Sequence, residues 1–391
     1  MSREQNEVIV NHLPSLTWNR LGVNAAKAVF DWNDGTEGKV SVRGLQSSEI
    51  TEEKLDSAAA DAWIKQYGSG IVRESYVAGK YAIYQKQAFA TGMGAGFDEW
   101  TAAHRGETTL YTVPAGAKET APVVITRTMQ ENVSDYREAL IHVRAGAEAA
   151  FILIDETPEE ICETAGGTAA LSTRVYLEEG SVLHLMKVNL LGRNYVQLDD
   201  TGAYVSDRAH FDFLQMELGG AKTYAGLYVD QAGRKSKFTC NTGYYTDADH
   251  LTDLNYVTAQ RAKKTVSEIL VKGVLADHAQ KVFRGTIDFR NGSAGSVGNE
   301  REDVLLLDQD VINKTTPVIL CEEEDVDGEH GATIGRLDED MLFYLGTRGI
   351  SEEEAERIMV RGRLNSIARE IPDEEVRIKL HCRLEKALGA E

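Results

Sequence analysis

A short phrase recurs through the middle of the sequence, and it limits the possible folds more than any other feature. Between residues 122 and 307, a turn with Gly or Ala and a charged residue precedes a β-rich run of alternating apolar residues. Examples are RAGAEAAFIL, EEGSVLHLMK, DRAHFDFLQ and AGRKSKFTC, whose starts are separated by roughly 17 to 35 residues. Because one such unit cannot bury its apolar face alone, stacked units have to make the core. The pattern predicts a β-solenoid, although the irregular spacing leaves a β-sandwich with long hairpins as an alternative.

The sequence changes in texture on either side of these repeats. We expect three regions: a mixed α/β region over residues 1–118, a β-helix core over 119–336 and a helical segment over 337–391. Within the first region, the alanine-rich run over 55–67 predicts a helix.

Two helical patterns occupy the C-terminal tail. Ser351 followed by Glu354 is a capping box, which predicts a helix start. After Pro372, the apolar residues Leu380, Leu384 and Leu388 recur every fourth position and predict a second helix. Such a stripe either packs against the chain's own β-domain or docks a partner. If the stripe docks a partner, replacement of Leu380 or Leu384 by Asp should abolish docking. If docking survives, we expect the docking surface to be the loop around Arg348.

Composition excludes several classes of function. The formal net charge is −20 and no run of Lys and Arg offsets it, which argues against nucleic acid as a partner. No apolar run approaches the roughly 20 residues needed to span a bilayer, and the start MSREQNEVIV carries no signal segment. The four cysteines lie far apart without a CxxC pair, which favours a reducing cytoplasm. Because no GxxxxGK[ST] loop is present, we expect no ATP hydrolysis by this chain itself.

Residues 281–350 carry the densest chemical information. A strand that ends at Cys321 is followed by an acidic run and then by Glu329-His330-Gly331, so a thiol, carboxylates and an imidazole fall within ten residues. Cysteine, histidine and carboxylates are the ligand set for iron, and thiolate is favoured by iron–sulfur chemistry. The plainer interpretation is an acidic turn that faces solvent.

The same segment carries a resemblance to a known family. KVFRGTIDF, EREDVLLLD and EDVDGEHGATIGRLDEDMLFYLGTRGIS are similar to the SufB/SufD family of iron–sulfur cluster assembly scaffolds, and SLTWNRLGVN near the start resembles its SufD-type members. The resemblance implies a right-handed parallel β-helix through which two subunits pair, here with a SufB-type paralogue. It also implies that the C-terminal helices dock a SufC-type ABC ATPase, and that a transient iron–sulfur cluster is built at the subunit interface by a protein that is not itself an enzyme.

Two positions bear on the choice between the two types. SufB-type members carry a cysteine where this chain has Glu302, and a carboxylate cannot accept persulfide sulfur as a thiolate can. SufD-type members carry a histidine in the HGAT motif, which here is His330. Both positions favour a SufD-like chain. The resemblance makes His330 a cluster or metal ligand, with Cys321, Glu329 and Glu302 as further metal candidates; Cys321 is alternatively a small core residue.

Two other functions remain as alternatives. A SufB-like subunit would form a homodimeric scaffold with two SufC-type ATPases, with Cys321 in place of the missing thiol. A β-helix enzyme that acts on acidic polysaccharide would need a basic or calcium-binding cleft, for which the sequence shows no cluster. The sequence leaves the cluster type undecided, as well as whether the complex binds a reduced flavin.

Overall fold

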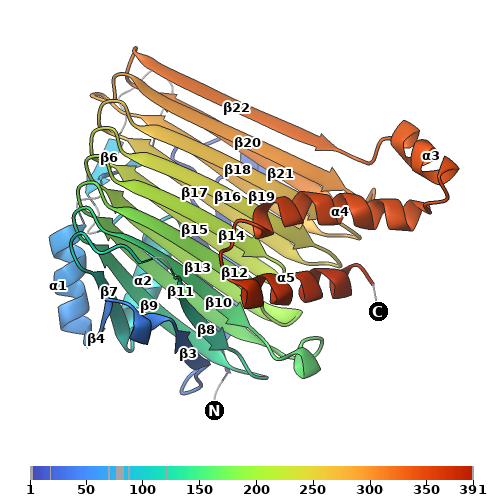
Figure 1. Cartoon of the computed structure of the whole chain (residues 1–391), viewed down its shortest axis with the longest axis horizontal. Helices are drawn as coiled ribbons and strands as arrows, with labels where there is room; N and C mark the ends of the chain where they lie inside the picture. The colour runs from blue at the N-terminus through green and yellow to red at the C-terminus, as the bar shows by residue number, and fades with distance from the viewer. Residues whose placement is uncertain are drawn as a thin grey trace.

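Two long sheets, wound from one continuous coil, make up most of the protein (Figure 1). The computed structural model describes residues 3–17, 19–68, 71–75, 83–86, 89–119 and 121–389. The first sheet, here the helix-covered sheet, contains in spatial order β3 (Lys39–Arg43), β8 (Val123–Thr128), β10 (Glu148–Glu156), β12 (Val182–Leu190), β14 (His210–Glu217), β16 (Lys237–Thr246), β18 (Val266–Leu275), β20 (Ser296–Leu306) and β22 (Val326–Gly335). The second, here the hairpin-covered sheet, contains β4 (Thr51–Leu55), β7 (Thr108–Val113), β9 (Ser134–Val143), β11 (Gly166–Leu177), β13 (Asn194–Val205), β15 (Lys222–Gln231), β17 (Leu251–Gln260), β19 (Gln280–Phe289) and β21 (Ile312–Cys321).

From β7 and β8 onward every strand runs parallel to its neighbours, and each coil contributes one strand to each sheet. Ala150 lies beside His184, 34 residues later, whereas Val196 lies beside Lys222, 26 residues later, so a coil takes 26 to 34 residues. The chain is thus a parallel β-helix, which confirms the predicted solenoid and excludes the sandwich. The variation in coil length explains the irregular spacing of the repeats.

The recurring turn phrase has a conformational cause. One residue in each of these turns has a positive φ: Gly146, Gly180, Arg208, Lys235 and Lys264, with values between +57° and +67°. Its backbone N–H donates to a carbonyl in the turn of the next coil, as Gly146 does to Glu179 at 3.0 Å and Lys235 to Lys263 at 3.0 Å. Gly has no steric penalty in this region, and the other residues tolerate it because the bond to the next coil stabilises the turn. The turns therefore stack into a ladder of their own.

An apolar core fills the space between the sheets, and further layers cover their outer faces. The inward side chains include Phe151, Leu185, Phe211 and Tyr256, all fully buried. Helices α4 (Glu352–Ala368) and α5 (Glu374–Ala387) lie on the outer face of the helix-covered sheet (Figure 1). The hairpin of β1 (Arg3–Val10) and β2 (Ala26–Asn33), together with α2 (Ala95–His104), packs on the hairpin-covered sheet.

The helix α1 (Ser57–Tyr67) also packs on the hairpin-covered sheet, where its Trp63 and Ile64 are buried with Leu140 of β9. The remaining elements are the antiparallel pair of β5 (Ile71–Ser75) and β6 (Ile83–Lys86), and α3 (Glu339–Thr347). Three short 3₁₀ turns, η1 (Asn19–Leu21), η2 (Leu45–Ser47) and η3 (Glu159–Ile161), complete the described elements. The helix predicted over 55–67 is confirmed as α1. The capping box at the start of α4 is also confirmed, because the Ser351 hydroxyl accepts from the Glu354 N–H at 3.2 Å.

The apolar stripe of the tail has a structural role. Val376, Leu380 and Leu384 are at most 2% exposed and pack against the helix-covered sheet with Val360 and Leu364. The interpretation that Leu380 and Leu384 form an open docking face is therefore wrong. The stripe instead attaches the helices to their own β-helix, because the sheet's outer face is itself apolar where they lie.

Candidate functional site at the last coil

The last coil of the solenoid is its most open part. β21 pairs with β19 and β22 pairs with β20, and within the described residues neither has a neighbour on its other side. Most residues of β22 are exposed, whereas β20 before it is largely buried. The interior between the two sheets therefore opens to solvent at this end.

His330 faces this open interior. In the parallel pairing of β20 with β22 it lies beside Glu300, and side chains at paired positions point to the same side of a sheet. Glu300 points inward and is 4% exposed, whereas His330 is exposed because no coil covers it. Glu329, one residue earlier, lies beside Asn299 and points to the outer face. The imidazole of His330 is thus accessible from the end of the solenoid.

Cys321 occupies a different position. It is the last residue of β21, it is exposed, and its thiol donates to the Glu323 carbonyl at 3.0 Å. β22 begins at Val326, so four residues of extended strand, or about 13 Å, separate His330 from the corner near Cys321. The structure therefore keeps these two candidate ligands apart within one chain.

Glu302 lies in the interior and is already paired. It is 1% exposed, forms an ion pair with the fully buried ammonium of Lys281, and accepts from the Thr315 hydroxyl at 2.6 Å. As a metal ligand it would have to leave this pair. The residue at the SufB cysteine position is thus a structural carboxylate in the observed arrangement.

Sequence reasoning missed Glu300, two residues before Glu302. Burial, with the neighbouring Glu302, raises the pKa of Glu300 to about 8 against the opposing effect of Lys281. Its Oε2 is buried without a hydrogen-bond partner. The signal was present in the sequence: in a strand, residues two apart share a face, so an inward Glu302 requires an inward Glu300. Two carboxylates and one lysine therefore lie below the open end.

The described part of the chain brings no three His, Cys, Asp or Glu side chains together in a metal-binding arrangement. Glu329 lies on the opposite face of β22 from His330, Cys321 lies at the corner at the far end of the coil, and Glu302 is already paired. If iron or a cluster binds at this end, His330 supplies one part of the ligand set and another chain has to supply the rest.

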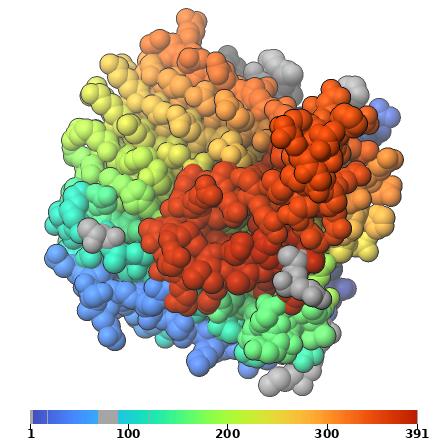
Figure 2. Space-filling view, turned by 45° about the vertical axis from the view of Figure 1, so that its right-hand side comes forward, coloured from blue at the N-terminus to red at the C-terminus, as the bar shows by residue number. Residues whose placement is uncertain are grey.

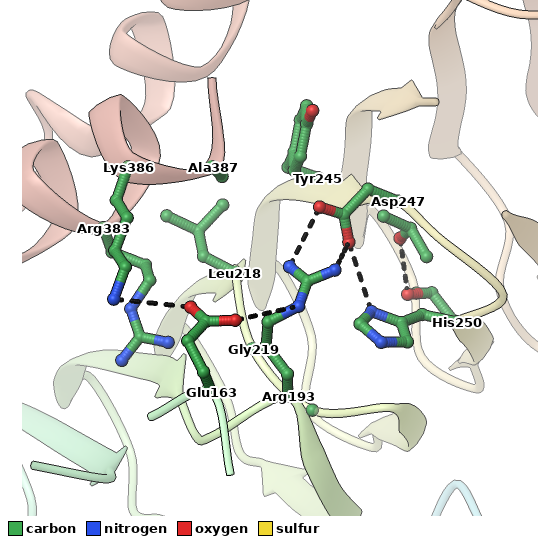
Figure 3. A pocket seen from close by; sticks show the side chains of 13 residues that line it. Glu163, Arg193, Leu218, Gly219, Tyr245, Asp247, His250, Arg383, Lys386 and Ala387 are labelled. Atoms are coloured by element: carbon green, nitrogen blue, oxygen red, sulfur yellow. Dashed lines mark hydrogen bonds and ion pairs between the residues drawn. The ribbon is translucent and has the colours of Figure 1, made fainter. Parts of the chain in front are cut away.

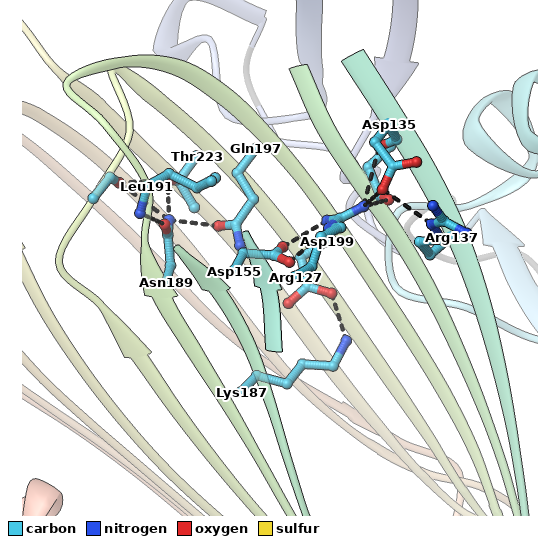
Figure 4. Close-up of polar contacts among 12 residues, drawn as sticks. Arg127, Asp135, Arg137, Asp155, Lys187, Asn189, Leu191, Gln197, Asp199 and Thr223 are labelled. Atoms are coloured by element: carbon cyan, nitrogen blue, oxygen red, sulfur yellow. Dashed lines mark hydrogen bonds and ion pairs between the residues drawn. The ribbon is translucent and has the colours of Figure 1, made fainter. Parts of the chain in front are cut away.

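The interior of the first coils, at the other end of the solenoid, contains a row of buried polar side chains (Figure 4). Arg127 donates twice to Asp155, at 2.7 Å each, and once to the Ala170 carbonyl at 2.8 Å. Deeper along the axis, Lys187 forms an ion pair with Asp199. These groups are 3 to 5% exposed and satisfy one another, so they stabilise the interior and offer no open ligand position.

A second cluster of charges lies where the C-terminal end of α5 meets the corner loops (Figure 3). It surrounds a cavity of about 190 Å³. Arg193 binds both oxygens of Asp247 at 3.0 and 3.1 Å, His250 contacts Asp247 at 3.2 Å, and Lys386 contacts Glu163 at 3.3 Å. These charges have opposite partners, and the Arg383 guanidinium of α5 donates to the Leu190 and Leu191 carbonyls, so we interpret this cluster as an anchor for α5.

No helix of the described chain is long and apolar enough to cross a bilayer.

Comparison with known proteins places this geometry in a family. Residues 125–363, from β8 into α4, match the model of the SufBD core domain of the SUF system for FeS cluster assembly. The iron–sulfur cluster assembly protein SufD of Bacillus subtilis is 29% identical over 194 residues, which cover 43% of this chain and 44% of that protein. A SufBD family protein of Staphylococcus saprophyticus is 24% identical over 294 residues, or 74% of this chain and 62% of the relative. A chloroplastic SufBD family protein of Arabidopsis thaliana is 28% identical over 195 residues, which cover 48% of this chain and 34% of that protein.

Each match covers less than two thirds of the relative's length. The matched core, in contrast, includes most of the β-helix and the first long helix that packs on it. With more than half of its residues in that match, the chain belongs to the SufBD family of iron–sulfur cluster assembly proteins.

Proposed function

We propose that this chain is a non-catalytic, SufD-like scaffold subunit of a cytoplasmic SUF complex. It pairs with a SufB-type subunit through its last coil and docks a SufC-type ATPase through its C-terminal segment, so that a cluster is built at the subunit interface. The observation that carries the proposal is the open end of the β-helix, where an accessible imidazole faces the exposed interior without further ligands.

The two edge strands of the last coil differ in their ability to pair. β21 contains Pro317 at its centre, and proline in a sheet is tolerated where its missing N–H would face solvent. β22 contains no proline and offers free backbone groups along its outer edge. A partner sheet is therefore expected to continue from β22, which is also the strand that carries His330.

The positions of the exposed apolar side chains also favour the last coil as the interface. Among the described residues, most of the exposed large apolar side chains lie on the last coil, on α3, or in the segment near Gly22. That segment belongs to the same end of the solenoid, because Gly22 lies close to the Lys314 side chain of β21. The exposed apolar residues in these places are Leu16, Leu21, Ile312, Ile334, Met341, Phe343 and Tyr344. Patches of this kind on a soluble domain favour protein contacts.

For the ATPase, α3 is a better docking surface than the tail helices. Figure 2 shows α3 projecting from the end of the molecule, whereas α4 and α5 lie flat on the sheet. Phe343 is 76% exposed and Tyr344 is 55% exposed, with the Arg348 guanidinium 5.2 Å from the Tyr344 ring. Exposed aromatic residues beside arginine are typical of residues that dominate binding energy at interfaces.

The docking proposal is tested with Phe343→Asp. We expect the variant to lose capture of a co-expressed SufC-type ATPase by at least about tenfold in affinity, because aromatic anchors contribute about 2 kcal/mol or more. Ile378→Asp, at a 54% exposed position on α5, is the matched control and should retain capture. If Ile378→Asp loses the ATPase and Phe343→Asp keeps it, docking lies on α5 instead.

The ligand role is tested with His330→Ala in the assembled complex. We expect an intact complex with reduced cluster yield, measured by visible absorbance after reconstitution with iron and sulfide. His278→Ala, an exposed histidine on a turn of the solenoid, is the control and should leave the yield unchanged. Equal yields in both variants would remove His330 from the site, and loss of folding would make it a structural residue.

A homodimeric scaffold with two ATPases is the second candidate, because the open last coil is also available to a second copy of this chain. Native mass spectrometry after co-expression with SufB- and SufC-type proteins separates the two. One copy with one SufB-type subunit and two ATPases supports the SufD-like role; two copies without a SufB-type subunit support the homodimer.

A further inference from the structure

The opposite end of the solenoid contains a cavity of about 420 Å³ between the two sheets. Its walls are inward-facing residues of the first coils: Val40 and Val42 on β3, Tyr111 on β7, Ile125 on β8 and Leu153 on β10. The register establishes their direction, because Val42 pairs with Ile125, which packs on the apolar core. The cavity is therefore the unfilled end of the interior.

The cavity persists because the first coil has small or charged residues where later coils have large ones. Phe211, Phe213 and Phe238 fill the middle coils, whereas β3 contributes Val40 and Val42. Although these two valines face the interior, they are 41% and 38% exposed. Water-exposed valines inside a solenoid lose the free energy that burial of apolar surface would provide. A ligand that covers them recovers it.

Polar groups are placed at two levels of this cavity. At its inner end lies the buried ion pair of Arg127 and Asp155, 4% and 5% exposed. At its rim, Lys54 contacts Glu107 at 3.0 Å and Glu52 at 3.4 Å, so one ammonium group meets two carboxylates there. The rim therefore favours a polar group that donates hydrogen bonds over an anion.

We propose that this cavity binds a small molecule with an apolar body and a polar end that is not an anion and that donates hydrogen bonds. The apolar side chains named above contact the body, and the carboxylates at the rim accept from the polar end. The volume lies within the range of about 300–1,000 Å³ that is typical of small-molecule sites. The site lies at the opposite end of the solenoid from His330.

The test uses N-phenyl-1-naphthylamine, a neutral, flat aromatic amine whose fluorescence rises in apolar surroundings. We expect saturable binding at one site per full-length chain. Val42→Trp fills the cavity and should weaken binding by at least about tenfold, and the nearly isosteric Val42→Thr should weaken it by a few fold, because a hydroxyl replaces a methyl group. Circular dichroism and thermal unfolding verify that both variants are folded.

Two matched variants identify binding elsewhere. Ile334→Trp alters an exposed position at the other end of the solenoid, and Phe343→Asp removes the exposed aromatic residue of α3; both should bind the dye as the unchanged chain does. Absence of saturable binding by the unchanged chain overturns the proposal. Binding that is unaffected by Val42→Trp, or that is lost in Ile334→Trp or Phe343→Asp, also overturns it.

Discussion

The two ends of the solenoid differ in the direction of their outermost strands. At the first coil, β3 and β4 run antiparallel to β8 and β7, so the chain reverses before the parallel winding begins. At the last coil, β21 and β22 run parallel to their neighbours and the ladder stops without a cap in the described chain. Edge strands invite further pairing unless it is opposed, and charged residues on an edge oppose it. Among the edge strands of the two long sheets, the short β3 and β4 carry the charged residues Lys39, Arg43, Glu52 and Lys54. These charges oppose strand pairing, so the first end is the poorer surface for a partner.

The same contrast holds for the charges inside each end. At the first end, the guanidinium of Arg127 is shared between Asp155 and Asp135, and Arg137 also contacts Asp135. At the last end, two carboxylates, Glu300 and Glu302, share the single ammonium of Lys281. The first end is balanced in charge, and the last end has an excess carboxylate. This difference can be tested at three levels, from global stability to proton binding.

The largest effect is expected from removal of the cation at the balanced end. Arg127→Met leaves Asp155 and Asp135 buried with one bonding partner fewer, and loss of one member of a buried ion pair costs about 3–5 kcal/mol. Lys281→Met should cost less, because Lys281 pairs with one carboxylate, Glu302, whereas Arg127 pairs with two. Urea unfolding measures both. A larger loss for Lys281→Met would contradict the proposed difference between a balanced end and an end with an excess carboxylate.

The sequence predicted the repeated part of this fold well because the repeat is local. Each turn phrase marks a residue with positive φ, and each alternating run marks a strand face, so the solenoid followed from neighbours in the chain. The reversal at β3 and β4 did not follow, because strand direction depends on partners far along the chain, such as Thr128, 89 residues after Lys39. The sequence left the burial of Leu380 open for the same reason: a periodic stripe defines a face of a helix, but not which surface covers it.

The candidate site was predictable in part. The ligand chemistry of His330 could be inferred from the motif. Its place on a strand was not predicted, because the acidic run before it indicated a turn, and the separation of Cys321 from His330 depends on the corner between β21 and β22. The pairing of Glu302 with Lys281 joins two strands that are not adjacent in sequence. Spacing along the chain therefore indicated which residues carry ligand chemistry and could not indicate which of them converge.

The second prediction concerns pairing between subunits. Ile334→Lys places a charge on the inward face of β22 at a position that is 44% exposed, and we expect it to weaken association with a SufB-type partner by about thirtyfold, or about 2 kcal/mol. Val42→Lys makes the same change at the first end and should leave association unchanged. Analytical ultracentrifugation of purified mixtures measures both. Weaker pairing in Val42→Lys alone would move the interface to the first end.

The third prediction concerns the excess carboxylate at the last end, whose effect on stability accumulates gradually with pH. Burial and the adjacent Glu302 raise the pKa of Glu300 to about 8 in the folded chain, against an ordinary value of 4.5. Between these values the folded chain holds a proton that the unfolded chain has released. The unfolded chain therefore binds fewer protons, and the free energy of unfolding falls as the pH rises, by about 1.4 kcal/mol per pH unit.

Glu300→Gln removes this dependence because the amide stays neutral. The variant should have a flatter stability profile between pH 5 and 8 than the unchanged chain, and its advantage should grow toward pH 8, as measured by urea unfolding at each pH. Glu268→Gln, an exposed position on the neighbouring strand β18, is the control and should leave the profile unchanged. Parallel profiles for Glu300→Gln and the unchanged chain would mean that Lys281 neutralises both carboxylates, and the last end would then be balanced in the same way as the first.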